Sequence, residues 1–246
     1  MGLAAGASLT LGGSAVWSFG SSAAFGIGRI EHGEGWNARA GALPRLLQQV
    51  EQRTSILVDD TCPVVSPESP SLFDTPFVVF SGDRGFPPLS EVARRNLEVY
   101  LRAGGTILFD SSEDDPDGEF YRSVVREIGY LVPDEPFSRI PSTHVLYKSF
   151  YLIDDPPGRS QIAPYLEGCS RDGRLQVIYN HNDLLGAWSR DNYGNWRYEV
   201  HPGGERQREM AFRMGVNIAM YVLCLDYKED QVHVPFILHR RDWRVD

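Results

Sequence analysis

Four consecutive polar residues, Asn180-His181-Asn182-Asp183, follow an apolar run that is typical of a buried strand. Each of these side chains can donate or accept a hydrogen bond, and His181 and Asp183 can also titrate. A second polar cluster, Asp110-Ser111-Ser112-Glu113, follows the apolar residues of 106–109 in the same way. Serine, histidine and aspartate are the residue types of nucleophilic hydrolysis, so these two clusters are the first places to look for chemistry.

A hydrolase is one interpretation of the two clusters. Ser111 or Ser112 would be the nucleophile, His181 the general base and Asp183 the group that orients the histidine. The acidic residues 113–115 place negative charge where an oxyanion would develop, and this disfavours the chemistry. No G-x-S-x-G pattern surrounds either serine.

A metal centre is a second interpretation. The oxygen and imidazole groups of Asp110, Glu113, His144, His181 and Asp183 are suitable ligands for a divalent ion. Their spacing matches no known metal motif such as H-E-x-x-H, because the residues are scattered along the chain. We therefore expect neither a resident metal nor a cofactor.

A pocket for a sugar or another small polar ligand is a third interpretation, since planar amides and the flat rings of Trp188 and Trp196 suit such a ligand. The residues expected to line it are Asp110, Ser112, Glu113, His144, Asn180, Asn182, Trp188, Glu205 and Arg206. The last two begin a long helix that could point its end at this pocket. The alternative is that Asn and Asp only bond neighbouring backbone groups and stabilise turns, and that His144 is structural.

The elements that must position these residues alternate between strands and helices. Apolar runs predict strands at 25–30, 55–60, 76–81, 106–110, 144–147, 175–179 and 232–238. Helical periodicity or capping signals predict helices at about 43–50, after Ser90, after Asp117 and over 205–225. This order favours a mostly parallel sheet flanked by helices. Both polar clusters then lie beyond the carboxyl ends of strands, where ligands bind in such sheets.

Composition narrows the classes of partner. The chain has 246 residues and a net charge of −9 without a basic stripe, which argues against binding to nucleic acid or to anionic lipid. Cys62, Cys169 and Cys224 have no zinc-site spacing, although one disulfide between two of them is an option in an oxidising compartment. Cys224 lies in an apolar helical pattern and is expected in the core.

The first residues have the pattern of an export signal. Residues 2–16 are small and apolar, and Ser22-Ala23-Ala24 supplies small residues at a cleavage site. We therefore expect a leader at 1–24, a single α/β domain at 25–246 without a transmembrane segment, and a periplasmic or otherwise extracytoplasmic location. Envelope proteins are the expected class of partner.

Several blocks of the sequence resemble a known bacterial family. The blocks GGTILFDSSE, THVLYKSFYLIDDPPGR, YNHNDLLGAWSRD and GGERQREMAFRMGVNIAMYVLCLDYK resemble the family described as domain of unknown function 4159, from about Phe25 to Arg240. The layout is similar, more distantly, to class I glutamine amidotransferase-like domains, including trehalose-utilisation-type proteins. That resemblance implies a three-layer, flavodoxin-like fold with Asp110-Ser111-Ser112 on a sharp turn after a strand.

The sequence departs from the amidotransferases at the residue that carries their activity. They need a cysteine at the turn, because a thiolate attacks the amide, and this chain has serine there. We therefore expect a noncatalytic binding or assembly module of the cell envelope. The alternative is a hydrolase acting on a carbohydrate or amide substrate with a Ser/His/Asp or metal-assisted site.

Overall fold

The computed structural model describes residues 24–231, and side chains as far as Cys224. A seven-stranded sheet in the order β4-β2-β5-β6-β9-β8-β7 forms the centre of this part of the chain. Its strands are β2 (Gly28–Ile30), β4 (Val64–Val65), β5 (Phe77–Gly82), β6 (Thr106–Ser111), β7 (Ser138–Arg139), β8 (Glu167–Arg171) and β9 (Arg174–Asn180). A separate parallel pair joins β1 (Phe25–Gly26) to β3 (Val58–Asp59).

The sheet is mostly parallel. The neighbours β4, β2, β5, β6 and β9 run in the same direction, whereas β8 and β7 continue the sheet in antiparallel fashion. All residues of β5 and β6 are buried, as expected for strands that are covered on both faces. The expected α/β fold with a largely parallel sheet is therefore confirmed.

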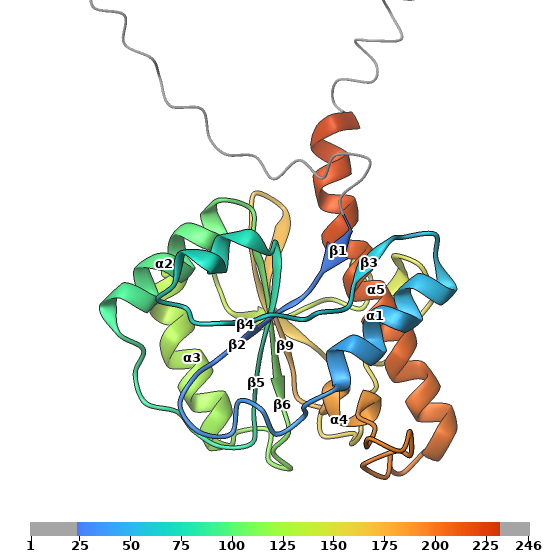
Figure 1. Ribbon diagram of the computed structural model, residues 1–246. Coiled ribbons are helices and arrows are strands. Elements are labelled where there is room, and N and C mark those ends of the chain that lie inside the picture. The colour runs from blue at the N-terminus through green and yellow to red at the C-terminus, as the bar shows by residue number, and fades with distance from the viewer. Residues whose placement is uncertain (1–23, 232–246) are drawn as a thin grey trace, which may run out of the picture.

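Helices cover both faces of the sheet (Figure 1). The face covered by α2 (Glu91–Arg102) and α3 (Glu119–Leu131) carries one apolar cluster, and the face covered by α1 (Ala42–Arg53), α4 (Leu184–Trp188) and α5 (Gly204–Gln231) carries the other. Two 3-10 helices, η1 (Pro70–Asp74) and η2 (Val145–Lys148), lie in the connections. The two covered faces give the polar residues at the ends of the strands two different environments.

Local sequence signals explain where α2 begins and ends. The hydroxyl of Ser90 accepts a hydrogen bond from the backbone N–H of Ala93, which satisfies one of the unpaired groups of the first turn. Gly104 follows the helix with φ of 109°, a conformation that glycine adopts easily. The N–H of Gly105 donates to the carbonyl of Tyr100 and closes the last turn. The sequence predicted both ends.

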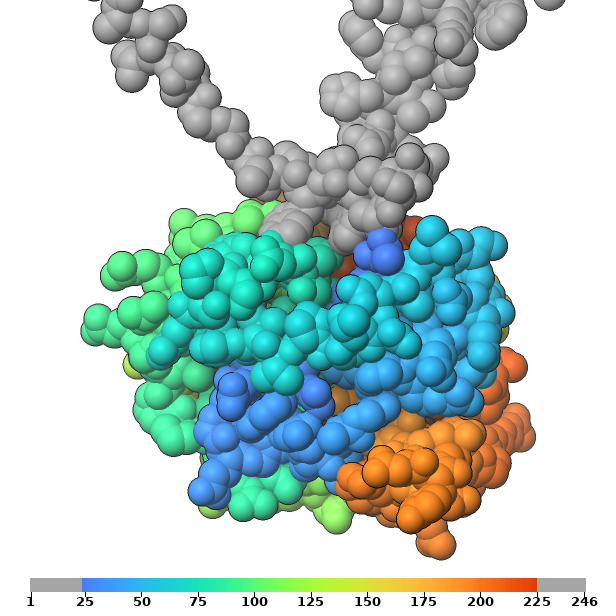
Figure 2. Space-filling model, in the orientation of Figure 1, coloured from blue at the N-terminus to red at the C-terminus, as the bar shows by residue number. Residues whose placement is uncertain are grey.

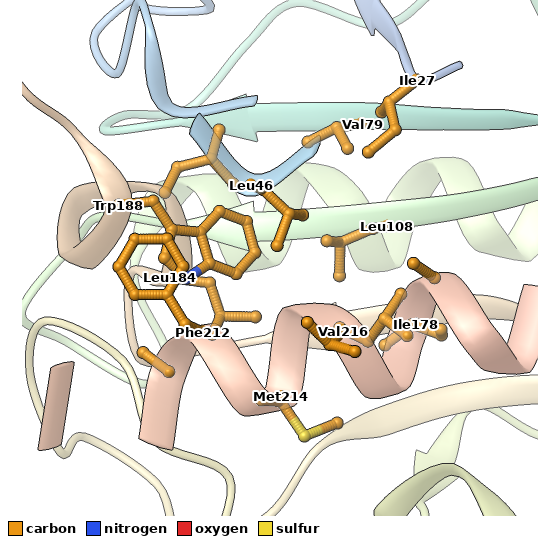
Figure 3. Packing of buried hydrophobic residues seen from close by; sticks show 14 of the residues in the cluster. Ile27, Leu46, Val79, Leu108, Ile178, Leu184, Trp188, Phe212, Met214 and Val216 are labelled. Carbon is orange, nitrogen blue, oxygen red and sulfur yellow. The ribbon is translucent and has the colours of Figure 1, made fainter. Parts of the chain in front are cut away.

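The fully buried Trp188 organises the packing between α4, α1 and α5 (Figure 3). Its ring stacks against Phe212, with ring centroids 6.3 Å apart, and Leu46 lies beside it. Gly215 allows α5 to approach, because a Cβ atom there would come within 2.4 Å of Leu46 Cδ1 and 2.6 Å of Trp188 Cζ2. A side chain at this position would overpack the core.

Two of the expected elements differ in the structure, and the strand β8 was not expected. The run 55–60 supplies only Val58 and Asp59 as a strand, which pairs with β1 outside the main sheet and is not buried. Residues 144–147 do not form a strand, because His144 caps the 3-10 helix η2 instead. The strand Glu167–Arg171 was not predicted, since its sequence EGCSR has no apolar run; β9 holds it in place by antiparallel pairing.

The cysteines are all free thiols. Cys62 and Cys169 are buried, whereas Cys224 is exposed, so the prediction that Cys224 lies in the core is wrong. The helix continues to Gln231, and position 224 faces away from the sheet side of α5. The periodicity of the helix was read correctly, but the apolar neighbours of Cys224 did not decide which side it faces.

Two sequence-based expectations lie largely or wholly outside the described residues. These are the leader at 1–24, apart from its last residue, and the strand expected at 232–238. Within residues 24–231, each helix is either too short or too polar to cross a membrane.

We expect Gly215→Ala to destabilise the protein by about 1–3 kcal/mol, because the new methyl group overlaps Leu46 and Trp188. The free energy of unfolding in urea measures this. Gly129→Ala in α3 is the matched control, since a Cβ atom there meets nothing within 4 Å; this change should be neutral or stabilise by up to about 1 kcal/mol. Equal destabilisation by the two substitutions would contradict the packing described for Gly215.

Candidate functional site

The two polar clusters meet at the edge of the sheet where the parallel strands end. In the register of β6 and β9, Asp110 lies opposite Asn180 and Phe109 lies opposite Tyr179. This is the lower edge of the sheet in Figure 1, where α4 begins after β9. The structure therefore brings together segments that are 70 residues apart, as the Asn180–Asp110 hydrogen bond shows.

Asp110 is a buried carboxylate with three hydrogen-bond donors. Its oxygens accept from the backbone N–H groups of Leu184 at 3.0 Å and Leu185 at 2.9 Å, and from the side-chain amide of Asn180 at 2.6 Å. Burial raises the pKa of Asp110, and the negative charge of Asp183 raises it further. Asp110 joins the end of β6 to the first turn of α4, and these bonds occupy both of its oxygens.

Asp183 is the centre of a buried ion-pair network. Its carboxylate accepts from Arg39 Nε at 3.0 Å and Nη2 at 2.7 Å, and also from Arg159 Nε. The same carboxylate caps α4 by accepting from the N–H of Gly186 at 2.8 Å. Asp183 has φ of 55°, a left-handed conformation that aspartate tolerates better than most residues. Its role in the fold is thus electrostatic and structural.

Arg39 is itself enclosed by its surroundings. Its guanidinium lies 4.1 Å from the centroid of the Tyr198 ring, and the hydroxyl of Tyr198 donates to the carbonyl of Ala38. Burial opposes the charge of Arg39, but the hydrogen bonds and negative charge of Asp183, together with Tyr198, raise its pKa overall. Figure 2 shows the segment after β2 (blue) lying against the segment around residues 190–200 (orange) on this side of the molecule.

Asn182 fastens a neighbouring loop with all four of its hydrogen-bonding positions. Its oxygen accepts from the N–H groups of Ile162 at 2.7 Å and Ala163 at 2.9 Å. Its amide donates to the carbonyls of Pro156 at 2.8 Å and Ala163 at 2.7 Å. Gly158 is required at this contact, since a Cβ atom there would lie 1.8 Å from the carbonyl oxygen of Asn182. This bonding matches the turn-stabilising interpretation of the residue.

Ser111 and His181 belong to the opposite face of the sheet. Side chains alternate along a strand, so residues 109 and 111 of β6 and 179 and 181 of the β9 segment point toward α2 and α3. His181 Nε2 lies 2.8 Å from Glu167 Oε2, and its ring packs against Tyr179 and Tyr121. Among the described residues, the side chain that bonds to His181 is Glu167 rather than Ser111 or Asp183.

The serines and Glu113 bond to nearby backbone. The hydroxyl of Ser111 accepts from the N–H of Glu113 at 3.2 Å, and the hydroxyl of Ser112 donates to the carbonyl of Gly82 at 3.1 Å. Both oxygens of Glu113 accept from the N–H of Phe120 in the first turn of α3, at 3.1 and 3.0 Å. Glu113 therefore stabilises the positive end of that helix.

The other expected ligand-binding residues lie apart from this edge or within the core. His144 accepts from the N–H of Leu146 at 3.1 Å, and burial lowers its pKa. Trp188 is fully buried in the core. Glu205 accepts a hydrogen bond from Arg208. Arg206 lines a separate cavity of about 300 Å³ together with Asp154, Asp155 and the start of α5, and His181 is not among the described residues that line this cavity.

The candidate metal ligands do not converge. Within residues 24–231, no group of three or more His, Cys, Asp or Glu side chains has the arrangement to hold a metal ion. Asp110 and Asp183 face α4, whereas His181 and Glu113 lie on the other face, and His144 caps η2. The described side chains supply scattered oxygen and nitrogen atoms that are already bonded within the chain.

Sequence reasoning missed the partners of the polar clusters. Arg39, Arg159 and Glu167 come from a loop before α1, a loop before β8 and β8 itself, and no motif connects them to Asp183 or His181. A lone arginine in a Gly/Ala-rich loop carries no spacing signal. Only the folded sheet brings these side chains to the strand ends.

His32 was also missed, and it lines a second cavity of about 310 Å³ at the carboxyl ends of β2, β4 and β5. Its side chain is 4% exposed, and its ring stacks on Phe80 with centroids 3.9 Å apart. Burial lowers its pKa to about 4, although the hydrogen bond to the carbonyl of Ser81 opposes this shift. His32 is therefore neutral at pH 7. A single histidine after a three-residue strand gave no signal in the sequence.

The chain belongs to the family described as Domain of unknown function (DUF4159), whose model matches residues 26–223. This match covers the sheet and most of α5 and confirms the resemblance seen in the sequence blocks. No curated protein matches the sequence at a significant level.

We expect Asp183→Asn to lower the free energy of unfolding by about 3–5 kcal/mol, because Arg39 and Arg159 would lose their shared buried counter-ion. Asparagine keeps the size, the helix cap and the tolerance for positive φ. Denaturant unfolding measures the loss. Asp83→Asn is the control: its pair with Arg84 lies at the surface, so its loss should change stability little. Similar losses in the two variants would contradict the network.

We also expect His32 to contribute to the pH dependence of stability. Its pKa is 6.5 in the unfolded chain and about 4 in the folded one, so the unfolded state binds a proton first as the pH falls. Stability should be full above about pH 6.5 and fall by up to about 3 kcal/mol toward pH 4. His32→Gln should show a smaller loss over the same range in urea titrations. Parallel curves for the two proteins would refute this role, since the other acid-sensitive groups are shared.

Proposed function

We propose that the chain is an exported, noncatalytic α/β domain that acts as a binding or assembly module of the cell envelope. The observation that carries this proposal is the bonding of the polar residues at the strand ends. Asp110, Asn182 and Asp183 are at most 1% exposed, and each bonds to groups of its own chain. A catalytic group must reach a substrate atom, and these side chains are enclosed.

The arrangement of the serine and histidine also supports a noncatalytic role. A hydrolase needs a serine hydroxyl that donates to its histidine, with a carboxylate on the far side of the ring. Here Ser111 bonds to backbone, His181 bonds to Glu167, and Asp183 bonds to arginines on the other face. The three residues that the sequence suggested as a triad have separate partners.

The assignment of the chain to the flavodoxin-like, glutamine amidotransferase-like fold is also part of this proposal. The parallel strands follow the order β4-β2-β5-β6-β9, which is the order 2-1-3-4-5 of the flavodoxin-like arrangement when these strands are numbered along the chain. This order supports the three-layer fold of glutamine amidotransferase-like domains. Serine at the turn where those enzymes carry cysteine supports a relative that has lost the reaction. Residues 25–246 form one domain in this proposal, and the small, apolar residues 2–16 support export of it.

A hydrolase acting on a carbohydrate or amide is the second candidate, and the His181–Glu167 pair is the observation that favours it. A carboxylate 2.8 Å from an imidazole nitrogen can orient a general base. The side chain of Glu167 is 13% exposed, compared with 3% for His181, so solvent reaches the pair mainly through the carboxylate.

We expect Ser111→Ala and His181→Gln to leave the cellular function of the protein unchanged, since neither residue acts in catalysis under this proposal. The native chain should also resist labelling by a fluorophosphonate probe, which reacts with activated serines. Thermal unfolding of both variants establishes that they fold. Labelling that disappears in Ser111→Ala but persists in Ser112→Ala would indicate that the protein is a serine hydrolase rather than a noncatalytic module.

A further inference from the structure

The loop of residues 148–155, which follows η2 and lies against α5, turns large apolar side chains toward solvent. Leu152 is 83% exposed and Phe150 is 44% exposed. Tyr151 and Ile153 alternate with them along the chain and pack against the core instead. A single exposed leucine is ordinary at a protein surface. Two neighbouring apolar side chains on the outer side of one loop are a candidate interface if the loop is held in a fixed conformation.

The buried Asn217 of α5 fixes the backbone of the 148–155 loop. Its side-chain oxygen accepts from the N–H groups of Phe150 at 3.1 Å and Tyr151 at 2.7 Å, and its amide donates to the carbonyl of Tyr151 at 2.8 Å. The N–H of Ile153 donates to the carbonyl of Tyr147 at 2.9 Å and closes the loop. A loop held in this way loses little conformational entropy when it binds, so its exposed side chains are preorganised for a partner.

The two ends of the 148–155 loop carry opposite charges. Lys148 precedes the apolar residues, Asp154 and Asp155 follow them, and all three charged residues are exposed. In a two-fold symmetric contact, each residue of one copy meets the equivalent surface of the other copy in reverse order. A two-fold axis through the middle of this loop therefore places the positive end of one copy beside the negative end of the other, with the apolar side chains between them. The loop is complementary to itself.

Other partners fit this pattern of charge less well. An anionic membrane would attract Lys148, but it would repel Asp154, Asp155 and a chain whose net charge is −9. A protein with a uniformly acidic or uniformly basic surface would meet one end of the loop with a like charge, which disfavours association. A second copy of the chain supplies an opposite charge at both ends.

We propose that the chain forms a two-fold symmetric dimer through the 148–155 loop. Phe150 and Leu152 of the two copies are in contact at the centre, and Lys148 of each copy lies beside Asp154 and Asp155 of the other. This interface goes beyond the proposed function, because it names the chain itself as a partner and requires neither export nor a ligand. It also uses none of the polar residues at the strand ends.

Sedimentation velocity of the full chain over a series of concentrations tests the dimer. A reversible monomer–dimer equilibrium is expected, with a dissociation constant in the micromolar range of modest interfaces. Leu152→Asp should weaken the dimer at least about tenfold, because it places a charge at the apolar centre of the contact. Val92→Asp is the matched control and should leave the dimer intact, since Val92 is also exposed but lies on α2 at the opposite face of the sheet from α5 (Figure 1).

Two charge variants test the pairing of the loop ends. Lys148→Glu makes both ends of the loop negative, and the double change Asp154→Lys with Asp155→Lys makes both ends positive. Each variant alone should dimerise at least about tenfold more weakly than the native chain, because like charges then face each other. An equal mixture of the two variants should form a mixed dimer about as well as the native chain, since opposite charges face each other again at both ends. A general effect on folding would not be reversed by mixing.

Three results would overturn the proposal. A native chain that stays monomeric at all concentrations would leave the loop to a different protein. Dimers that persist unchanged in Leu152→Asp would show that the copies associate through another surface. Failure of the two charge variants to associate when mixed, with both folded by circular dichroism, would remove the pairing of the loop ends. None of these results bears on the noncatalytic role, which the fluorophosphonate probe tests separately.

Discussion

The carboxylate of Asp110 is the constraint on which the arrangement of the strand ends depends. It is buried, and it joins the carboxyl end of β6 to the backbone of α4 and to Asn180 on β9. Placing a carboxylate in such a position costs free energy unless donors surround it. The backbone N–H groups of Leu184 and Leu185 and the amide of Asn180 are these donors, while the neighbouring Asp183 pairs with Arg39 and Arg159. The helix α4 and its core residue Trp188 are positioned by these bonds.

The sheet separates the polar residues into two groups with different neighbours. On the α1, α4 and α5 face, carboxylates meet arginines and backbone N–H groups. On the α2 and α3 face, His181 and Glu167 lie among tyrosines. His181 and Asp183 are separated because β9 ends at Asn180 and the chain then turns, with Asp183 in a left-handed conformation at the start of α4. Ser111 and His181 share the α2 and α3 face but bond to different groups, so a triad does not assemble. Nearness in sequence at 180–183 concealed this division.

Much of the fold follows from local signals in the sequence. The apolar runs of β5 and β6, the cap at Ser90 and the glycine stop after α2 predicted the elements well, because burial and capping act over a few residues. The strand at Glu167–Arg171 was missed because pairing with β9, rather than its own composition, makes it a strand. The site was predictable only in part. Its polar residues stand out after apolar runs, but Arg39 and Glu167 reach them through the tertiary fold alone.

The sheet ends on each side in a strand of only two residues, β4 and β7. An edge strand offers unpaired backbone groups to any other chain that approaches in an extended conformation, and a long flat edge invites continued pairing between molecules. With so few residues at either border, little backbone is available for such pairing. Prolines also flank both edge strands, Pro63 and Pro67 around β4 and Pro136 and Pro141 around β7, and Arg139 adds a charge to β7. The borders of the described sheet are therefore protected against edge-to-edge self-association.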